Sequence, residues 1–270
     1  MPFTLPVFKG LSVVKWIRKF RHPNLVKLLG YCLEDEEFLT VSEYVQNGSL
    51  EHHLCNNDAE LLPWVTRLNI ARGAVRGLAF LHRTKEQAMY RSFKASDILL
   101  DMDFNAKLSD YGLAKSNSTS GESICSTLTD FPRKDVGYVD PVYLATGHLT
   151  VKSDIYGFGA ILLEILTGLR VLDLNRPNGK LDLVQYAKTF LSGKGNLRSI
   201  LDQRLEHDCL PEDEVSSEVA ILALKCLEDF PKNRPGVEEV LETLDQIHAI
   251  QTKLIKSTAS TQHPTLQSQV

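Results

Sequence analysis

Apolar side chains recur every three or four positions between residues 63 and 82, at Leu68, Ala71, Val75, Leu78 and Leu81. This spacing predicts an amphipathic helix with one buried face. The same kind of pattern predicts further helices over residues 154–167, 183–191, 216–228 and 237–254. Most of the chain is therefore expected to form a helical body.

The first half of the chain also carries strand signals. Residues 38–45 are rich in β-forming side chains and lead into the turn signal Asn47-Gly48, which predicts a strand that ends in a hinge. Residues 98–100 and 106–109 flank a polar turn and predict a short hairpin. Ahead of these strands, residues 13–20 predict a helix with Val13, Trp16, Ile17 and Phe20 on one side. Sheet is thus expected as a minor component.

Two segments have few apolar residues. Residues 116–129 are dense in serine and threonine, which predicts an exposed loop. Residues 257–270 are polar and predict a disordered tail.

Composition narrows the class of protein. The chain has 270 residues, 43% of them apolar and 24% charged, so a globular domain with a sizeable core is feasible. The net charge of -4 and pI of about 6.1 provide no basic field to attract nucleic acid. Five cysteines without a Cys-x-x-Cys pair argue against a disulfide framework and a zinc site. Reduced cytosol is the compartment that these observations favour.

No membrane attachment is predicted for this sequence. The longest apolar run, residues 155–166, is too short to span a bilayer and contains Glu164. Pro2 stands where myristoylation needs a glycine, and no secretory leader follows Met1. We therefore expect a cytoplasmic protein without a membrane span or lipid anchor. Any recruitment to the plasma membrane would occur through its partners.

Residues 90–100 carry the most informative motif. They read Tyr-Arg-Ser-Phe-Lys-Ala-Ser-Asp-Ile-Leu-Leu and resemble the catalytic loop of a protein kinase, His/Tyr-Arg-Asp-Leu-Lys-x-x-Asn followed by an apolar strand. Ser92 stands at the position of the catalytic aspartate. Phosphoryl transfer of this type needs a carboxylate there to orient the substrate hydroxyl and accept its proton. A serine hydroxyl is neutral and a very poor base, so this loop argues against the chemistry of the family that it resembles.

Other motifs extend the likeness over residues 22–250, in the order found in plant receptor-like cytoplasmic kinases. They lie at residues 22–32 (HPNLVKLLGYC), 47–50 (NGSL), 107–115 (KLSDYGLAK), 137–141 (GYVDP), 152–156 (KSDIY) and 233–235 (NRP). The resemblance implies an α+β, protein-kinase-like fold with an incomplete small β lobe and a mainly helical large lobe. It implies a partial N-terminal lobe at 1–46, a C-terminal lobe at 47–255 and a disordered polar tail at 256–270.

The resemblance assigns metal ligands to two acidic residues. Asp110-Tyr111-Gly112 matches Asp-Phe-Gly, whose aspartate holds magnesium over the nucleotide phosphates. Asp97 replaces the asparagine that coordinates the second metal, and a carboxylate is also a good ligand for a hard cation. The alternative is that Asp97 only begins a turn and is solvated. Tyr111 would need a hydrogen-bond partner for its hydroxyl if it is buried.

Two basic residues of the loop have implied roles in phosphate binding. Lys94 matches the lysine that contacts the transferred phosphate. Arg91 matches the arginine that grips a phosphorylated activation loop, for which the acceptors here would be Ser123, Ser126, Thr127 and Thr129. The alternative is that Arg91 only ties loop backbone and that these hydroxyls are ordinary linker residues.

For the nucleotide, the resemblance implies contacts from the hinge residues Glu43, Tyr44 and Val45 and from Leu99. Ser42 stands at the gatekeeper position, where a small residue would widen the pocket. The family's Gly-rich loop, phosphate lysine and glutamate partner have no counterpart before His22, and Val13 occupies the glutamate position. We therefore expect ATP and Mg²⁺ to bind weakly or not at all.

The remaining assignments concern structure. The Ala-Pro-Glu position reads Asp140-Pro141-Val142, so the glutamate that pairs with Arg234 is missing. A buried arginine without a partner is costly, so Arg234 must be hydrated, displaced or re-paired, with Asp140 as one substitute. Asp154, in the motif at residues 152–156, is assigned a structural role. Asp135 replaces a threonine of the substrate-binding segment. Six of the eight histidines, at positions 52, 53, 82, 207, 248 and 263, form no ligand cluster in sequence and receive no chemical role.

These features lead us to expect an inactive pseudokinase that acts as a protein-binding scaffold or decoy in receptor-like kinase signalling. Its implied partners are receptor-like kinases or other signalling proteins, not nucleic acid. One alternative is a weakly active serine/threonine kinase, because Lys94, Asp97 and Asp110 are retained. A second alternative is a truncated gene product without a selected function.

Overall fold

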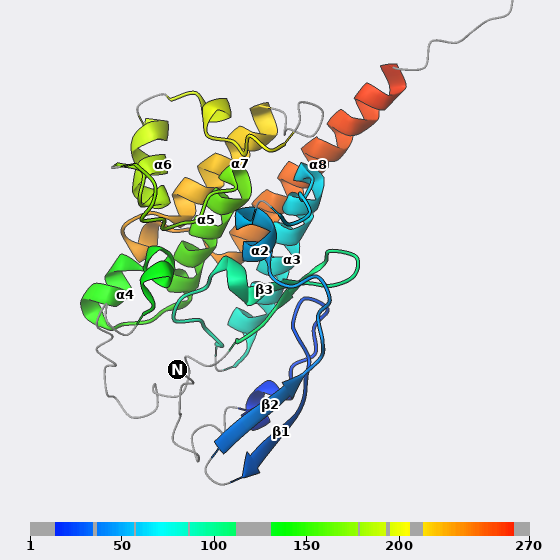
Figure 1. Cartoon of the computed structure of the whole chain (residues 1–270), viewed down its shortest axis with the longest axis vertical. Helices are drawn as coiled ribbons and strands as arrows, with labels where there is room; N and C mark the ends of the chain where they lie inside the picture. The colour runs from blue at the N-terminus through cyan, green and yellow to red at the C-terminus, as the bar shows by residue number, and fades with distance from the viewer. Residues whose placement is uncertain are drawn as a thin grey trace, which may run out of the picture.

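The structure is a computed structural model that describes residues 14–34, 37–56, 58–85, 87–111, 131–177, 179–192, 195–205 and 213–261. It has an α+β fold, as expected, with a small lobe built on a two-stranded sheet and a large helical lobe (Figure 1). In the small lobe, β1 (Leu28–Glu34) pairs antiparallel with β2 (Glu37–Ser42). The hairpin projects from one end of the helical lobe (Figure 1).

The first segment of the large lobe contains α2 (Leu50–Cys55), α3 (Trp64–Arg83) and the short turn η1 (Ala95–Asp97). The hairpin that follows consists of β3 (Ile98–Leu100) and β4 (Ala106–Leu108), which pair antiparallel. The hairpin expected at this place is confirmed. The five apolar positions that predicted α3 are all buried.

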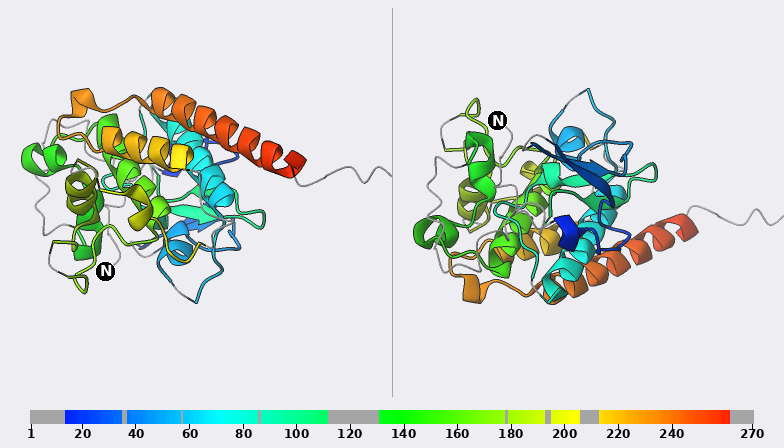
Figure 2. Two further views of the ribbon diagram at one scale, coloured as in Figure 1. Left: turned by 90° about the horizontal axis from the view of Figure 1, so that it is seen from above. Right: turned by 90° about the horizontal axis from the view of Figure 1, so that it is seen from below.

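The second half of the large lobe is helical. It begins with η4 (Arg133–Tyr138), α4 (Pro141–Thr146) and α5 (Val151–Thr167). It continues with α6 (Leu183–Ser192), η5 (Leu197–Ser199), α7 (Asp213–Cys226), η7 (Pro231–Asn233) and α8 (Val237–Thr261). Helix α7 packs on α5, and α8 lies along α3 (Figure 2).

Helix α5 runs through the centre of the core. Thr150 caps its first turn by accepting a hydrogen bond from the Lys152 N–H, and Gly168 ends it in the left-handed conformation at φ +65°. Every residue from 153 to 167 is buried. A helix that is covered on all sides explains why its sequence contains the longest apolar run of the chain.

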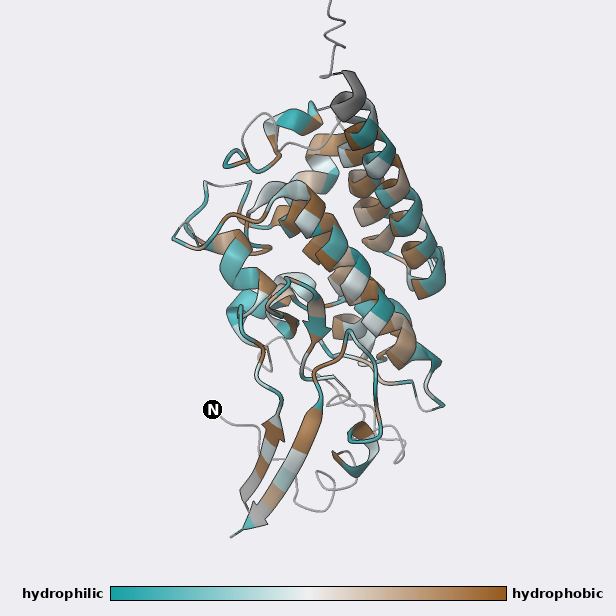
Figure 3. Ribbon diagram, turned by 90° about the vertical axis from the view of Figure 1, so that its right-hand side faces the viewer, coloured by the Kyte–Doolittle hydropathy of each residue, from teal (hydrophilic) through white to brown (hydrophobic). Residues whose placement is uncertain are grey.

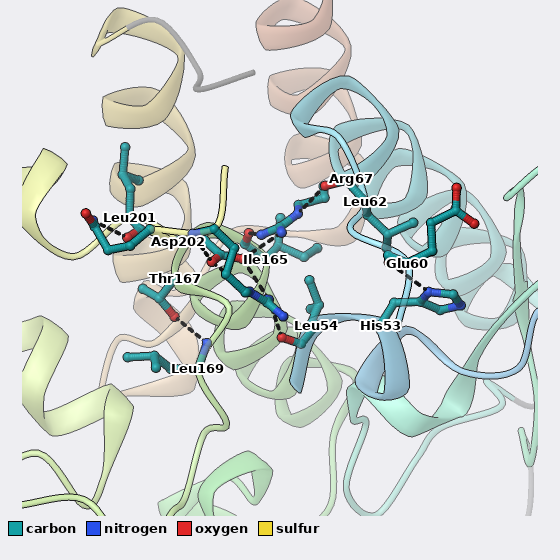
Figure 4. A network of polar contacts seen from close by, with 12 residues as sticks. His53, Leu54, Glu60, Leu62, Arg67, Ile165, Thr167, Leu169, Leu201 and Asp202 are labelled. Carbon is teal, nitrogen blue, oxygen red and sulfur yellow. Dashed lines mark hydrogen bonds and ion pairs between the residues drawn. The ribbon is translucent and has the colours of Figure 1, made fainter. Parts of the chain in front are cut away.

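A buried arginine, Arg67, joins helix α3 to helix α5. Arg67 of α3 donates to the carbonyl oxygens of Leu62 and Ile165, each at 2.9 Å, and to Asp202 Oδ2 at 2.6 Å (Figure 4). Arg204 also pairs with Asp202 and donates to the Leu54 carbonyl oxygen. The guanidinium of Arg67 is thus fully partnered, which a buried charge requires.

Several boundaries differ from expectation. The strand expected over residues 38–45 is β2, which ends at Ser42, and the helix expected over residues 216–228 is α7, which ends at Cys226. The helix expected over residues 237–254 continues to Thr261, so residues 256–261, expected in a disordered tail, are helical. Leu254 still packs partly against the core, which supports the last turns. At the other end, residues 14–17 form a helical turn with Val14 and Ile17 buried, while Val13 lies outside the described residues.

Candidate active site

Helix α5 holds the loop around Ser92 in place. Asp154 Oδ1 accepts a hydrogen bond from the Tyr90 N–H at 2.9 Å, and its Oδ2 lies 2.7 Å from Nε2 of His82. Burial raises the pKa of Asp154, against the opposing effects of His82 and the Tyr90 N–H. Asp154 therefore ties the loop to α5. His82, which received no role from the sequence, is its partner.

Glycine in α5 lets the loop approach the helix closely. A Cβ on Gly157 would lie 2.4 Å from the carbonyl oxygen of Phe93, so no larger residue fits while the loop stays in place. The Phe93 ring also stacks on Phe158, with ring centroids 6.4 Å apart. The position of the loop is thus set by helix packing.

The residue at the catalytic position is half-buried. Ser92 Oγ lies 3.5 Å from the backbone carbonyl oxygen of Asp135, at the long limit for a hydrogen bond. Its hydroxyl has no negative charge with which to accept a proton.

Lys94 lies beside Ser92 and is paired with a carboxylate from another segment. Its Nζ lies 2.5 Å from Oδ2 of Asp135, and the two side chains are 25% and 7% exposed. Burial lowers the pKa of Lys94. The hydrogen bond to Asp135 and the charges of Asp97 and Asp135 raise the pKa and together outweigh burial, so the net shift is upward. Sequence reasoning noted Asp135 only as a change in the peptide site and missed this pair, because 41 residues separate the partners.

The two candidate metal ligands lie on either side of Ser109. The backbone carbonyl oxygen of Asp97 accepts from the Ser109 N–H at 2.8 Å, and Ser109 Oγ lies 3.4 Å from Oδ2 of Asp110. Asp97 is only 5% exposed, so the alternative of a merely solvated turn residue is wrong. Burial raises its pKa to about 8, Lys94 opposes the shift, and Asp110 adds to it.

These carboxylates fit a magnesium ion by their donor chemistry. Mg²⁺ prefers oxygen ligands and is often bound through one or two carboxylates while it keeps several waters. Asp110 is exposed and has a φ of +54°, a left-handed conformation that aspartate adopts more readily than most residues other than glycine. In the described part of the chain, no three His, Cys, Asp or Glu side chains gather as a ready metal site.

The hinge residues have different environments. Glu43 Oε1 accepts from the Lys27 N–H and from Lys107 Nζ, each at 2.9 Å. Lys107 in β4 is the register partner of Leu99 in β3, so the structure brings Glu43 and Leu99 to one region. Val45 is buried, whereas Tyr44 is 81% exposed. The Tyr44 side chain therefore lies in solvent, while Val45 packs into the interior.

The remaining loop residues also have partners. Arg91 Nε donates to the Tyr143 hydroxyl at 3.3 Å, and its guanidinium lies 5.1 Å from the centre of the Phe131 ring. The hydroxyl of Tyr111 donates to the Val26 carbonyl oxygen at 2.7 Å, which supplies the partner that a buried tyrosine needs. The four phosphate acceptors proposed for Arg91 lie outside the described residues.

Arg234 is re-paired, one of the three outcomes left open for it. Its Nη1 and Nη2 donate to Oδ2 and Oδ1 of Asp140 at 2.7 and 2.8 Å. Both side chains are essentially buried, at 0% and 1% exposure. Such a two-bond geometry is the strongest that an arginine and a carboxylate form. Asp140 therefore takes the place of the missing glutamate.

Comparison with known proteins decides the family. The model of the protein kinase domain matches residues 11–244. The chain belongs to the protein kinase family. Among similar proteins of this family, the serine/threonine-protein kinase BIK1 of Arabidopsis thaliana is 46% identical over 239 residues, which are 88% of this chain and 59% of BIK1. Receptor-like cytoplasmic kinase 176 of Oryza sativa subsp. japonica gives the same four values.

A third relative is an EPD1-interacting receptor-like cytoplasmic serine/threonine-protein kinase of Nicotiana benthamiana. It is 45% identical over 237 residues, which are 88% of this chain and 50% of the relative. This kinase-family chain thus spans between half and three fifths of the length of these curated relatives. Over the residues that the structure describes, no helix is long and apolar enough to cross a membrane.

Proposed function

We propose that this protein kinase domain is catalytically inactive and acts as a protein-binding scaffold or decoy in receptor-like kinase signalling. The observation that carries the proposal is Ser92, whose neutral hydroxyl stands at the catalytic position of an otherwise well-anchored loop. General-base function needs a group that can take a proton near the operating pH, and an alcohol cannot. The loop thus keeps its conformation but lacks a group that can accept the substrate proton.

The partners that we propose are receptor-like kinases or other signalling proteins in the cytoplasm. This part of the proposal is drawn from the relatives, of which one is named a receptor-like cytoplasmic kinase and another an EPD1-interacting kinase. A folded kinase domain without turnover would compete with an active relative for the same partner.

A phosphate-transfer assay tests the inactivity. The purified chain is incubated with labelled ATP, Mg²⁺ and a protein substrate, beside Asp110→Ala, which lacks one candidate metal ligand. We expect label incorporation no higher than that of the variant. If the wild type incorporates more label than Asp110→Ala, the proposal is overturned. Binding to a receptor kinase would then have to be explained as recognition of a substrate.

A weakly active serine/threonine kinase is the second candidate function. It is favoured by Lys94, Asp97 and Asp110, which are brought within one region around Ser109 and η1. In this case a bound cation and Lys94 would orient the nucleotide without a base. The same assay separates the two candidates, because only this one gives label that depends on Asp110.

A further inference from the structure

The pair of Lys94 and Asp135 joins the catalytic loop to a segment that follows it in sequence. Asp135 belongs to η4, and its N–H donates to the Pro132 carbonyl oxygen at 2.8 Å. Its carboxylate is therefore held by a helical turn. With Nζ and Oδ2 at 2.5 Å and Asp135 only 7% exposed, this is a charge-assisted hydrogen bond shielded from water.

Lys94 is already paired with a negative charge within the fold. Its ammonium group lies against the carboxylate of Asp135, which comes from η4. Its backbone N–H also donates to Oδ2 of Asp97 at 3.2 Å. A cation that is already paired with a carboxylate at this distance has less attraction left for an incoming phosphate.

Positions 92 and 135 have exchanged functional groups relative to the family pattern. The pattern has a carboxylate at the first position and a threonine hydroxyl at the second, whereas this chain has Ser92 and Asp135. The two residues are adjacent in space, because Ser92 Oγ reaches the Asp135 carbonyl oxygen. A carboxylate is thus kept beside Lys94, but it comes from η4 and not from the loop.

We propose that Asp135 is an internal anion that occupies Lys94, closes the phosphate side of the nucleotide site and fastens η4 to the catalytic loop. This inference goes beyond the proposed function, which concerns proton transfer at Ser92. It concerns access of a nucleotide and stands whether or not phosphate is transferred.

Nucleotide affinity tests the proposal without any measurement of activity. ATP with Mg²⁺ is titrated calorimetrically into the whole chain and into Asp135→Asn, which removes the charge and keeps the shape. We expect Asp135→Asn to bind at least about tenfold more tightly, because one close opposing charge is removed from the phosphate site. In the double variant Lys94→Met with Asp135→Asn, the gain should disappear.

Asp103→Asn is the matched control, since Asp103 lies in an exposed turn and its loss changes the net charge equally. Its affinity should equal that of the wild type. If Asp135→Asn does not fold by circular dichroism, Asp135→Thr gives the same test with the residue that the family pattern has. Equal affinity of the folded Asp135 variant and the wild type, including no binding by either, overturns the proposal.

Discussion

At the scale of single residues, the Arg234 site shows how a charge pair survives a changed motif. Asp140 caps α4 by accepting from the Val142 N–H and also accepts from Ser153 Oγ, both at 2.9 Å, while it binds Arg234. The carboxylate therefore reaches the guanidinium from the cap position, two residues before the position that the family pattern uses. Removing it would leave a buried guanidinium with backbone carbonyl acceptors but without a negative charge to balance it, which is a costly loss.

We predict that Asp140→Ala lowers the free energy of unfolding by about 3 to 5 kcal/mol, because Arg234 is stranded in the core. Adding Val142→Glu should restore part of the loss, since it returns a carboxylate to the position of the family pattern. Urea unfolding measures both. Asp245→Ala is the control, because Asp245 pairs with two arginines, Arg72 and Arg76, but is 42% exposed, so its loss should cost about 1 kcal/mol or less. Equal costs for the two alanine variants would contradict the prediction.

The sequence alone reveals residue-level features where the information is local. The substitution at Ser92 and the missing partner of Arg234 are visible as departures from motifs at fixed spacing. The pairs of Lys94 with Asp135 and of His82 with Asp154 join residues 41 and 72 positions apart. Only the packing of α5 and η4 brings them together, so local spacing holds no sign of them.

At the scale of elements, α5 is the frame of the site. It supplies Asp154 to the loop, Gly157 to Phe93, and Glu164 to η4. Glu164 is fully buried and accepts from the Tyr138 hydroxyl at 2.7 Å and from the Val171 N–H at 2.8 Å. Burial raises its pKa to about 8, against the opposing effect of these two donors.

This raised pKa predicts a pH dependence of stability. Between about pH 4.5 and 8 the unfolded chain releases the Glu164 proton while the folded chain keeps it, so this group's stabilisation is lost as pH rises. We predict that the wild type loses up to about 1.4 kcal/mol per pH unit relative to Glu164→Gln, which does not titrate. Urea unfolding at several pH values measures the difference.

The control for this series is Glu239→Gln on the exposed face of α8, whose stability profile should run parallel to that of the wild type. A Glu164→Gln profile that is parallel to the wild type as well would show that Glu164 is ionised in the folded state.

Element prediction from the sequence was accurate for the long helices and the hairpin of β3 and β4. Their apolar positions follow a clear period, because each packs one face or all faces into the core. The end of α8 was misplaced, since residues 256–261 are polar and carry no periodic signal although they continue the helix. The partner strand β1 was not predicted, and its exposed and buried positions do not alternate regularly.

At the scale of the whole molecule, the small lobe presents apolar side chains to solvent. Leu29 in β1 is 50% exposed, and Leu39 and Val41 in β2 are 60% and 55% exposed. Figure 3 shows hydrophobic positions along both strands of this hairpin. Among the described residues β2 pairs with β1 alone, so its other edge has no strand beside it there. An apolar face next to an open edge favours association.

We predict that the chain self-associates as its concentration rises, because the β2 face and edge can be covered by a second copy. The double variant Leu39→Lys with Val41→Lys should shift the onset to higher concentration, since charge on an edge strand opposes pairing. Light scattering over a concentration series measures the onset. Leu174→Lys is the control, because Leu174 is 63% exposed but lies apart from the hairpin. A monomeric wild type at high concentration would refute the prediction.

The close approach of Gly157 to Phe93 has a consequence for protein engineering. The backbone of the loop rests on a helix and not on the side chains that would meet a substrate. The backbone at position 92 is thus held in place independently of which side chain that position carries. A designer who wished to reintroduce an acid could alter that one side chain and its neighbour at 135 while leaving the scaffold underneath untouched.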